Sequence, residues 1–283
     1  YGRIGRGLHR RILQGADDVE VVAINSGSDA KSHAHLLKYD SLYGKCDADI
    51  KVEGDNLVVD GKKIEVLQIR DPKDINWKKQ DVDIVIESTG KFTDTAAVQG
   101  HLDAGAKKVL ITSPCNDAKI PHIVMGVNDE EVDVDQYKIV SNASCTTNCV
   151  APVLKVLNDE FKLEKAFVST IHAFTYTQNL LDNSNPEDFR RARATTESII
   201  PTTTGAMQAI SKIIPELQGK VDGMAFRVPI PTVSCIYVVA KLAKDVSVEQ
   251  VNKMFKSYES HDLHGILGTT AEPLVSVDFR GDS

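Results

Sequence analysis

Short apolar runs alternate with helix-length segments through the first half of the chain. A helical pattern over residues 6–14 is the first of these segments. Strand-like apolar runs follow at 19–25, 82–86 and 108–112. Such alternation is typical of β-α-β units, in which helices join parallel strands and cover their sheet. Residues 1–143 are therefore predicted to form an α/β domain around a parallel sheet, with an inserted hairpin that turns at Asp60-Gly61.

The second half of the chain has a different pattern. A helix is expected from Val150 to about residue 161, followed by longer alternating strands at 166–171 and 233–239. Alternation of apolar and polar residues along such strands predicts a sheet with one covered face. Residues 144–283 are expected to form a second, α+β domain with an antiparallel sheet backed by helices.

Composition excludes several classes of protein. The 283 residues include 33 basic and 40 acidic side chains, a net charge of −7, which argues against a nucleic-acid or anionic-membrane partner. No run approaches the roughly 18 apolar residues that a membrane span needs. The five cysteines are an odd number in a long chain, so we expect free thiols in a reducing compartment, the cytoplasm.

Both ends of the sequence are abrupt. The chain opens at Tyr1 without a methionine and stops at Ser283 shortly after a strand-like stretch. We expect a segment of a longer protein, cut at both ends, so a transit peptide cannot be judged from this N-terminus.

A glycine turn stands at the head of the first predicted helix. The segment Gly2-Arg3-Ile4-Gly5 matches the end of a G-x-G-x-x-G pattern, in which glycines let the backbone approach a pyrophosphate at a helix N-terminus. Two glycines three residues apart are common, so an ordinary turn between strand and helix remains the alternative.

The end of the second strand lacks the acidic residue that usually holds the adenosine ribose of a dinucleotide. The sequence there reads Asn25-Ser26, and the nearest carboxylate is that of Asp29. A neutral turn would not repel a 2′-phosphate. The sequence therefore favours NADP, or acceptance of both NAD and NADP.

Cys145 is the candidate nucleophile. It lies in the small, polar segment Ser141–Cys149, directly before the apolar helix. Backbone N–H groups and the helix dipole favour a thiolate at such a position. His172, at the end of an apolar strand, is the candidate base, although spacing alone does not establish the pairing.

Anion binding is expected at three places in the second domain. Thr202-Thr203-Thr204-Gly205 precedes an apolar helix and offers hydroxyls and backbone donors to a phosphate. Arg227 lies between apolar residues, where an unpaired charge would be costly. The arginine-rich segment 190–193 could bind phosphate, or could be a solvated loop or a subunit contact.

Taken together, these residues resemble the phosphorylating glyceraldehyde-3-phosphate dehydrogenase family along essentially the whole chain. Ser141–Cys149 matches the family's nucleophile signature, and four further segments fall in family order: 2–6, 37–41, 87–90 and 200–205. The resemblance implies a Rossmann-type cofactor domain at 1–143 and a catalytic domain at 144–283. It also implies an NAD(P)-dependent oxidoreductase of glucose metabolism, in glycolysis or gluconeogenesis, that forms a homotetramer.

The resemblance also implies roles for individual residues. Cys145 would attack the aldehyde of D-glyceraldehyde 3-phosphate, His172 would handle the proton, and inorganic phosphate would release 1,3-bisphosphoglycerate from a thioester. The substrate and phosphate contacts would be Ser144, Thr146, Thr175, Arg191, Thr204, Gly205 and Arg227. The cofactor contacts would be Gly2, Arg3, Ile4, Gly5, Asn25, Ser26, Arg70, Ser88, Thr89, Gly90, Ser113 and Ser184. No metal site is expected.

Two departures from the family pattern concern the cofactor. Ser26 stands where NAD-type members usually carry an aspartate, and Ser184 stands where they often carry a proline. Both favour dual or NADP-preferring behaviour. A related dehydrogenase acting on erythrose 4-phosphate and a non-catalytic scaffold on the same fold are the alternatives. The intact Thr204-Gly205 pair and Thr146 favour the phosphorylating enzyme over the first alternative. The net charge of −7 and the complete set of Cys145, His172 and Arg227 argue against the second.

Overall fold

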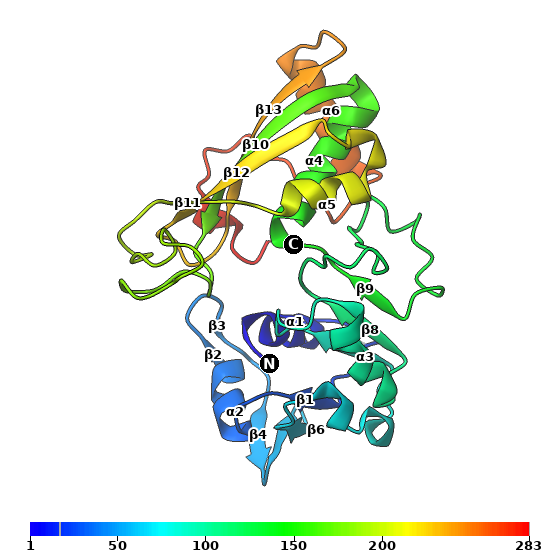
Figure 1. The fold of residues 1–283 in the computed structure, drawn as a ribbon, viewed down its shortest axis with the longest axis vertical. Coiled ribbons are helices and arrows are strands. Elements are labelled where there is room, and N and C mark those ends of the chain that lie inside the picture. The colour runs from blue at the N-terminus through cyan, green and yellow to red at the C-terminus, as the bar shows by residue number, and fades with distance from the viewer. Residues whose placement is uncertain (17, 283) are drawn as a thin grey trace. The chain divides into compact units, whose positions relative to one another are not determined.

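The computed structural model describes residues 1–16 and 18–282 (Figure 1). They form two compact units, one of Tyr1–His122 with Asp133–Ala143, and one of Ile123–Val132 with the residues from Ser144 onward. The expected boundary near 143 thus coincides with a unit boundary, but 123–132 packs with the second unit. Gly126 shows why: it has a φ of +74°, and a Cβ there would lie 2.6 Å from the Ile266 side chain.

The first sheet of unit 1 has the strand order β1-β6-β5-β4. Its strands are β1 (Ala23–Asn25), β4 (Ile50–Glu53), β5 (Asn56–Val59) and β6 (Lys62–Leu67), with a small separate hairpin of β2 (Tyr39–Asp40) and β3 (Gly44–Lys45). β1 is shorter than the predicted 19–25 and runs parallel to β6. The predicted hairpin is confirmed. Asp60 and Gly61 both have positive φ (+49° and +81°), as a two-residue type I′ turn requires.

Two helices belong to this part of unit 1, α1 (Arg3–Leu13) and α2 (Ala30–Lys38). Leu37 on α2 and Leu57 on β5 are fully buried in a common core with Ile24 and Ile64. The helix predicted at 6–14 is confirmed as α1, which begins earlier, at Arg3, and ends at Leu13.

The second sheet of unit 1 is wholly parallel, as predicted. It consists of β7 (Ile84–Glu87), β8 (Lys108–Ile111) and β9 (Ile139–Ser141). Helix α3 (Thr95–Asp103) joins β7 to β8, and the short 3-10 helices η1 (Pro72–Asp74) and η2 (Trp77–Gln80) precede them. Residues 88–90 and 113 follow the carboxyl ends of β7 and β8, the edge where open α/β sheets bind ligands.

Unit 2 contains a mixed sheet with the order β11-β12-β10-β13. The strands are β10 (Leu163–Ala173), β11 (Ile200–Thr202), β12 (Val221–Val228) and β13 (Cys235–Leu242), and the helices are α4 (Cys145–Phe161), α5 (Ala206–Ile213), α6 (Val248–Ser260), η3 (Pro215–Leu217) and η4 (Ser276–Phe279). Both outer pairs are antiparallel, as expected, whereas the central pair β10–β12 is parallel. The parallel pair is possible because β11 and α5 intervene between β10 and β12.

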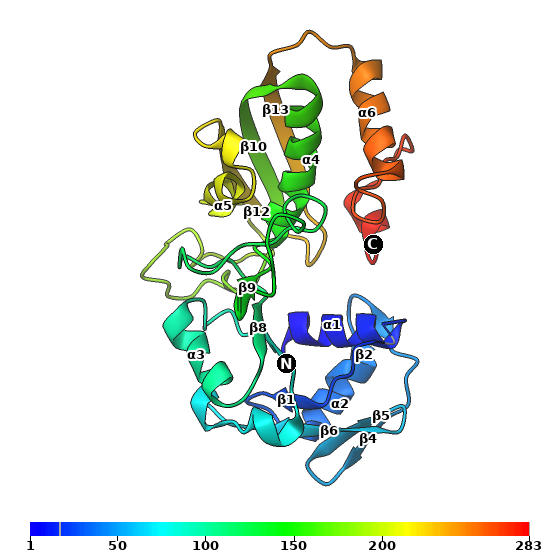
Figure 2. The same cartoon turned by 90° about the vertical axis from the view of Figure 1, so that its right-hand side faces the viewer.

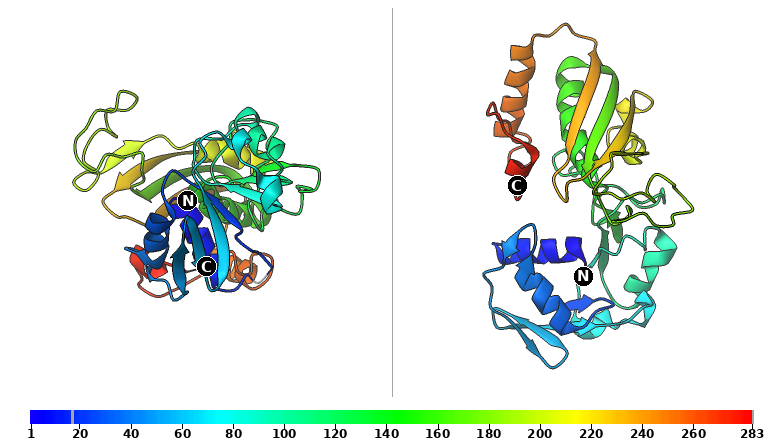
Figure 3. Two further views of the ribbon diagram at one scale, coloured as in Figure 1. Left: turned by 90° about the horizontal axis from the view of Figure 1, so that it is seen from below. Right: turned by 90° about the vertical axis from the view of Figure 1, so that its left-hand side faces the viewer.

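Helices cover one face of this sheet. Ala166, Val168 and Thr170 of β10 are buried, while Phe167 between them is 43% exposed. α4 lies between the sheet and α6 in Figure 2 and in the right-hand view of Figure 3. Val150 and Leu154 of α4 are fully buried, so this helix is anchored along its length. No helix in the described part of the chain is long and apolar enough to cross a membrane.

Candidate active site

Cys145 is the first residue of the 17-residue helix α4. The preceding Ser144 caps the helix, because its hydroxyl accepts the Thr147 N–H at 3.0 Å. The Asn148 amide donates to the Ser144 carbonyl at 2.9 Å and fixes the same turn. The prediction that Cys145 stands at a helix N-terminus is confirmed, and the cap holds its sulfur at the positive end of the helix dipole.

The Cys145 sulfur lies 3.4 Å from His172 Nε2. This contact lowers the pKa of the Cys145 thiol; burial opposes the shift, and bonds from the Thr146 N–H and hydroxyl add to it. Burial raises the pKa of Cys149, one helical turn further on. Of the two cysteines on α4, the geometry therefore activates Cys145 alone.

His172 is 7% exposed near the end of β10. Its Nδ1 lies 2.6 Å from the carbonyl oxygen of Ala173. A carbonyl can only accept, so this contact favours the proton on Nδ1; in that tautomer Nε2 faces the sulfur and can exchange a proton with it. This carbonyl is a site component that residue-type reasoning missed, because any residue can supply it.

Arg227 reaches the same group of atoms. Parallel pairing of β10 and β12 sets Arg227 beside His172 in register. Its Nη1 lies 3.0 Å from His172 Nδ1 and donates to the Ala173 carbonyl at 3.2 Å and to Thr175 Oγ1 at 3.3 Å. The predicted residues Cys145, His172, Thr175 and Arg227 are thus brought together within unit 2.

The charge of Arg227 is only partly compensated. Burial lowers the pKa of its guanidinium, the thiolate of Cys145 offsets part of this shift, and the positive charge of Arg191 adds to it. Among the described residues, Arg227 Nε is buried without a hydrogen-bond partner. Arg191 forms an ion pair with Asp188 at 3.1 Å. Two guanidinium groups, of which only that of Arg191 pairs with a carboxylate among the described residues, suit a bound phosphate dianion.

The remaining predicted phosphate contacts lie at helix starts. Gly205 caps α5 without a side-chain hydrogen bond, and Thr204 Oγ1 accepts the Ala206 N–H at 3.2 Å. No hydrogen bond between described residues joins Thr204 or Gly205 to Cys145. Gln178, which the sequence analysis missed, positions Thr175 by accepting its N–H at 2.8 Å.

The glycine turn fits a dinucleotide pyrophosphate. Gly2 caps the 11-residue helix α1 and supplies no side-chain hydrogen bond, so the first-turn donors stay open. A Cβ on Gly5 would lie 3.2 Å from Ser88 Oγ, which shows how closely the two predicted residues approach. Ile4 is 59% exposed. Arg3 binds Asp40 at 2.9 Å, so its guanidinium already has a partner.

The end of β1 is held by the side chain of Asn25. Its amide oxygen accepts the Ile69 N–H and its amide nitrogen donates to the Ile69 carbonyl, both at 2.9 Å. Asn25, predicted to contact the cofactor, therefore also holds the turn in place. The exposed Arg70 directly follows Ile69 in the chain. Asp29, the nearest carboxylate, caps α2 by accepting the Ser32 N–H at 2.7 Å.

The loop after β7 is turned partly inward. The Thr89 hydroxyl and N–H both bind the Glu87 carboxylate, so this hydroxyl is not free for a ligand. Gly90 has a φ of +69°. Ser113 Oγ, after β8, is buried and has no hydrogen-bond partner among the described residues, as expected for a group awaiting a ligand. Ser184 lies in an exposed loop of unit 2, where its N–H binds the Asn183 side chain at 2.8 Å.

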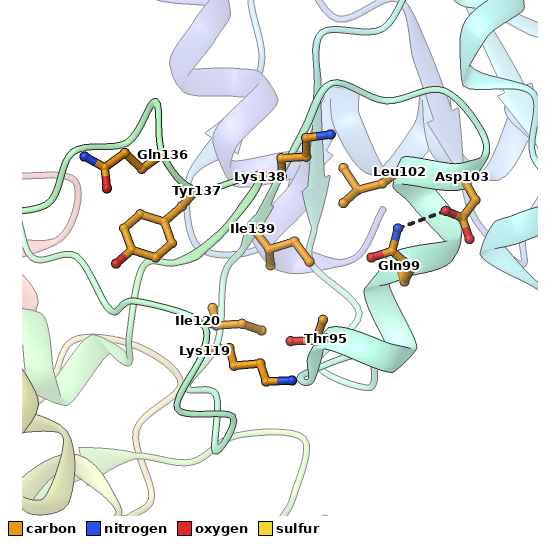
Figure 4. A pocket seen from close by; sticks show the side chains of 10 residues that line it. All are labelled: Thr95, Gln99, Leu102, Asp103, Lys119, Ile120, Gln136, Tyr137, Lys138 and Ile139. Carbon is orange, nitrogen blue, oxygen red and sulfur yellow. Dashed lines mark hydrogen bonds between the residues drawn. The ribbon is translucent and has the colours of Figure 1, made fainter.

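A separate pocket of about 410 Å³ opens in unit 1 (Figure 4). Its lining comes from α3, β9 and the segments before β9: Thr95, Gln99, Leu102, Asp103, Lys119, Ile120, Gln136, Tyr137, Lys138 and Ile139. Gln99 donates to Asp103 at 2.8 Å within it. The pocket contains none of the predicted site residues.

A parallel α/β unit with an open glycine turn, joined to a unit with an activated cysteine, defines a nucleotide-dependent enzyme that works through a thiolate. The family profile described as "Glyceraldehyde 3-phosphate dehydrogenase, NAD binding domain" matches residues 1–95, and that of the "C-terminal domain" matches residues 144–283. The chain therefore belongs to the glyceraldehyde-3-phosphate dehydrogenase family.

Curated relatives agree with this assignment. The glyceraldehyde-3-phosphate dehydrogenase of Priestia megaterium is 53% identical over 282 residues, which cover 100% of this chain and 83% of the relative. Glyceraldehyde-3-phosphate dehydrogenase 1 of Bacillus subtilis is 51% identical with the same coverage. The enzyme of Geobacillus stearothermophilus is 50% identical over 283 residues, 84% of its length.

Proposed function

We propose that this protein oxidises D-glyceraldehyde 3-phosphate to 1,3-bisphosphoglycerate, with inorganic phosphate and NAD(P)+ as co-substrates. The observation that carries the proposal is the 3.4 Å contact between Cys145 Sγ and His172 Nε2 at the start of α4. A thiolate at a helix N-terminus, paired with an imidazole, is suited to attack on an aldehyde carbon.

The chemistry follows from this pair. His172 Nε2 takes the thiol proton and passes it to the aldehyde oxygen as the Cys145 sulfur bonds to the aldehyde carbon, which gives a thiohemiacetal and leaves Nε2 free to take a proton again. NAD(P)+, when bound, would supply the acceptor for the hydride on that carbon. His172 Nε2 takes the hydroxyl proton as the hydride leaves, which gives an acyl thioester on the sulfur. A phosphate oxygen then attacks the acyl carbon, and the thiolate leaves. N–H groups at the start of α4 stabilise the oxyanion in both additions.

The anion site orients the substrates. Arg227, Arg191 and Thr175 hold the phosphate of the sugar, because a phosphate supplies the negative charge and acceptors that the two guanidinium groups lack. Thr146, Thr204 and Gly205 receive the attacking phosphate, and Ser144 acts by capping α4.

On the cofactor side, Gly2–Gly5 at the α1 terminus would hold the pyrophosphate. The residues Ser88, Thr89, Gly90 and Ser113 would surround the rest of the dinucleotide, and Ser184 would approach it from a neighbouring subunit.

We also propose dual or NADP-preferring cofactor use. The turn after β1 carries the neutral Ser26, and the exposed Arg70 directly follows Ile69, the residue that the Asn25 side chain binds. A 2′-phosphate would meet no carboxylate at position 26, and Arg70 is the cation that we propose for it. Ser26→Asp should therefore weaken NADP+ binding about tenfold or more while leaving NAD+ binding nearly unchanged. Equal effects on both cofactors would contradict the proposal.

The decisive experiment measures NAD(P)H formation from D-glyceraldehyde 3-phosphate by the full-length protein, with and without inorganic phosphate. Activity that depends on phosphate and is lost in Cys145→Ser supports the proposal. Phosphate-independent oxidation of erythrose 4-phosphate would support the related dehydrogenase. An inert Cys145 under iodoacetamide would support a scaffold. Arg227→Gln serves as a probe of the anion site, and should raise KM for the phosphorylated aldehyde more than for unphosphorylated glyceraldehyde.

We further propose a homotetramer in the cytoplasm. The uncovered face of the unit 2 sheet supports assembly: Phe167 pairs in register with Val239, and both are exposed, as is the nearby Tyr237. An exposed apolar sheet face of this kind is typical of a subunit interface. No disulfide joins any of the five cysteines in the described part of the chain, in keeping with a reducing compartment. Sedimentation of the full-length protein tests the assembly, and Tyr237→Lys should weaken it.

A further inference from the structure

A buried chain of hydrogen bonds runs through unit 1 behind the candidate cofactor loop. Trp77 Nε1 on η2 donates to His101 Nδ1 on α3 at 3.1 Å. His101 Nε2 lies 3.3 Å from Glu87 Oε2 at the end of β7. The three residues are 5%, 4% and 4% exposed, respectively. A charged carboxylate and an indole N–H buried so deeply must be well paired, because either would be costly without a partner.

The direction of each bond in this chain is determined. An indole nitrogen only donates, so His101 Nδ1 must be the acceptor and carries no proton. The neutral ring therefore holds its proton on Nε2 and donates it to Glu87. Burial alone would raise the pKa of Glu87, but the bonds from His101 and Thr89 outweigh it and lower the pKa, so the carboxylate is ionised. Only one tautomer of His101 satisfies both neighbours.

The outer end of the chain holds the loop after β7. Glu87 Oε1 accepts the Thr89 N–H at 2.7 Å and also the Thr89 hydroxyl. The same hydroxyl accepts the Lys91 N–H at 3.1 Å, across Gly90 with its positive φ. Ser88 in this loop lies close to Gly5, since a Cβ added to Gly5 would be 3.2 Å from Ser88 Oγ. The loop is thus fixed from inside the unit next to the glycine turn.

We propose that Trp77, His101 and Glu87 act as positioning residues for dinucleotide binding: they hold the Ser88–Gly90 loop against the glycine turn of α1 in the geometry that receives the cofactor. The inference rests on the proposed function, because it takes NAD(P)+ as the ligand of this loop. None of the three side chains needs to touch the cofactor, since they act through Thr89.

Glu87→Gln tests the proposal because it keeps the shape of the side chain and removes the negative charge of its carboxylate. The new amide must turn its NH2 group toward the Thr89 N–H or toward His101 Nε2–H, and either arrangement sets two donors against each other. His101 can move its proton to Nδ1, but that proton then faces the Trp77 N–H. We expect faster amide hydrogen exchange at residues 88–91 in the cofactor-free protein. We also expect NAD+ binding, measured by calorimetry, to be about ten- to a hundredfold weaker.

Trp77→Phe added to Glu87→Gln provides the critical comparison. The phenyl ring removes the indole N–H, so His101 can adopt the other tautomer and accept from the new amide. The double variant should therefore bind NAD+ more tightly than Glu87→Gln alone and regain amide protection at 88–91. A role in packing alone would make the two substitutions additive or worse. Glu53→Gln, an exposed position in the same unit, is the matched control and should change neither measurement.

Unchanged exchange and affinity in Glu87→Gln, or a double variant weaker than Glu87→Gln, would overturn the proposal. If Glu87→Gln does not fold, Thr89→Val removes the two bonds of the Thr89 hydroxyl, to Glu87 and from the Lys91 N–H, but keeps the bond of the Thr89 N–H, and it should give a smaller change of the same sign. If the wild-type protein binds neither NAD+ nor NADP+, the proposed function fails. The exchange measurements still show in that case whether the buried chain orders the loop.

Discussion

His9 makes the stability of unit 1 depend on pH in a way that can be calculated. The ring is 3% exposed on α1, and the Tyr1 hydroxyl donates to its Nδ1. Burial lowers the pKa of His9 from 6.5 to about 4. The folded protein thus keeps this ring neutral over a pH range in which the unfolded chain protonates it.

The sign and size of the change in the free energy of unfolding follow from proton linkage. Above pH 6.5 both states hold a neutral ring and His9 makes no difference. As the pH falls from 6.5 toward 4, only the unfolded state gains the proton, so the free energy of unfolding decreases. At about 1.4 kcal/mol per pKa unit, the full loss is roughly 3 kcal/mol, of which about 2 kcal/mol is already present at pH 5.

His9→Phe removes the titration while keeping a buried ring. Urea unfolding of wild type and variant is followed at pH 7.5 and pH 5 by the fluorescence of Trp77, the sole tryptophan of the chain, which is buried in the same unit. The variant leaves the Tyr1 hydroxyl without its acceptor, but burial raises the pKa of Tyr1, so this penalty is equal at both pH values. The free energy of unfolding of the variant, relative to that of the wild type, should therefore be about 2 kcal/mol higher at pH 5 than at pH 7.5.

His35→Phe is the control, because His35 is exposed on the neighbouring helix and should show no such gain. A stability difference between His9→Phe and wild type that is the same at both pH values would refute the argument. It would mean that water reaches the His9 ring in the folded protein.

Three further substitutions test the site and the core. His172→Gln removes the main cause of the lowered pKa of Cys145, so alkylation of Cys145 by iodoacetamide at pH 7 should slow by about tenfold or more. The alkylation rates of the variant and the wild type should converge above about pH 9, where both thiols are ionised. Gly5→Ala places a methyl group 3.2 Å from Ser88 Oγ and should weaken NAD+ binding roughly fivefold in calorimetry, without loss of alkylation at Cys145. Gly223→Ala places a Cβ 2.3 Å from a β10 carbonyl oxygen, so chemical denaturation should show a loss of about 2–3 kcal/mol; an unchanged midpoint would contradict the packing described for β10 and β12.

Local features of the fold were predictable because they depend on residues within one turn of each other. Asp60-Gly61 tolerates positive φ, so the hairpin could be predicted from two residues and their flanking strands. Small, polar residues before an apolar helical pattern placed Cys145 at a helix start, and Ser144 is the cap that such a segment supplies. The parallel sheet followed in the same way from the alternation of strand and helix.

Features that depend on how strands pair could not be predicted from the sequence. The strands expected at 166–171 and 233–239 do pair antiparallel, but β12 (Val221–Val228) was not predicted, and its parallel register with β10 is what sets Arg227 beside His172. The intramolecular bonds of Asn25 and Thr89, both predicted to contact the cofactor, were not foreseen either: their side chains bind backbone or buried groups of their own unit. Nothing in either residue type indicates which way its polar atoms will point.

The sequence by itself determined that this chain has a dinucleotide-type α/β unit and a helix-terminal cysteine, because periodicity and capping are short-range properties. The tertiary structure decided that the imidazole of His172, 27 residues further along, reaches the Cys145 sulfur at 3.4 Å. It also decided that Glu87, buried behind the cofactor loop, has exactly the partners that keep it ionised. Both outcomes depend on packing between elements distant in sequence, where small changes in strand register or helix position would separate the groups.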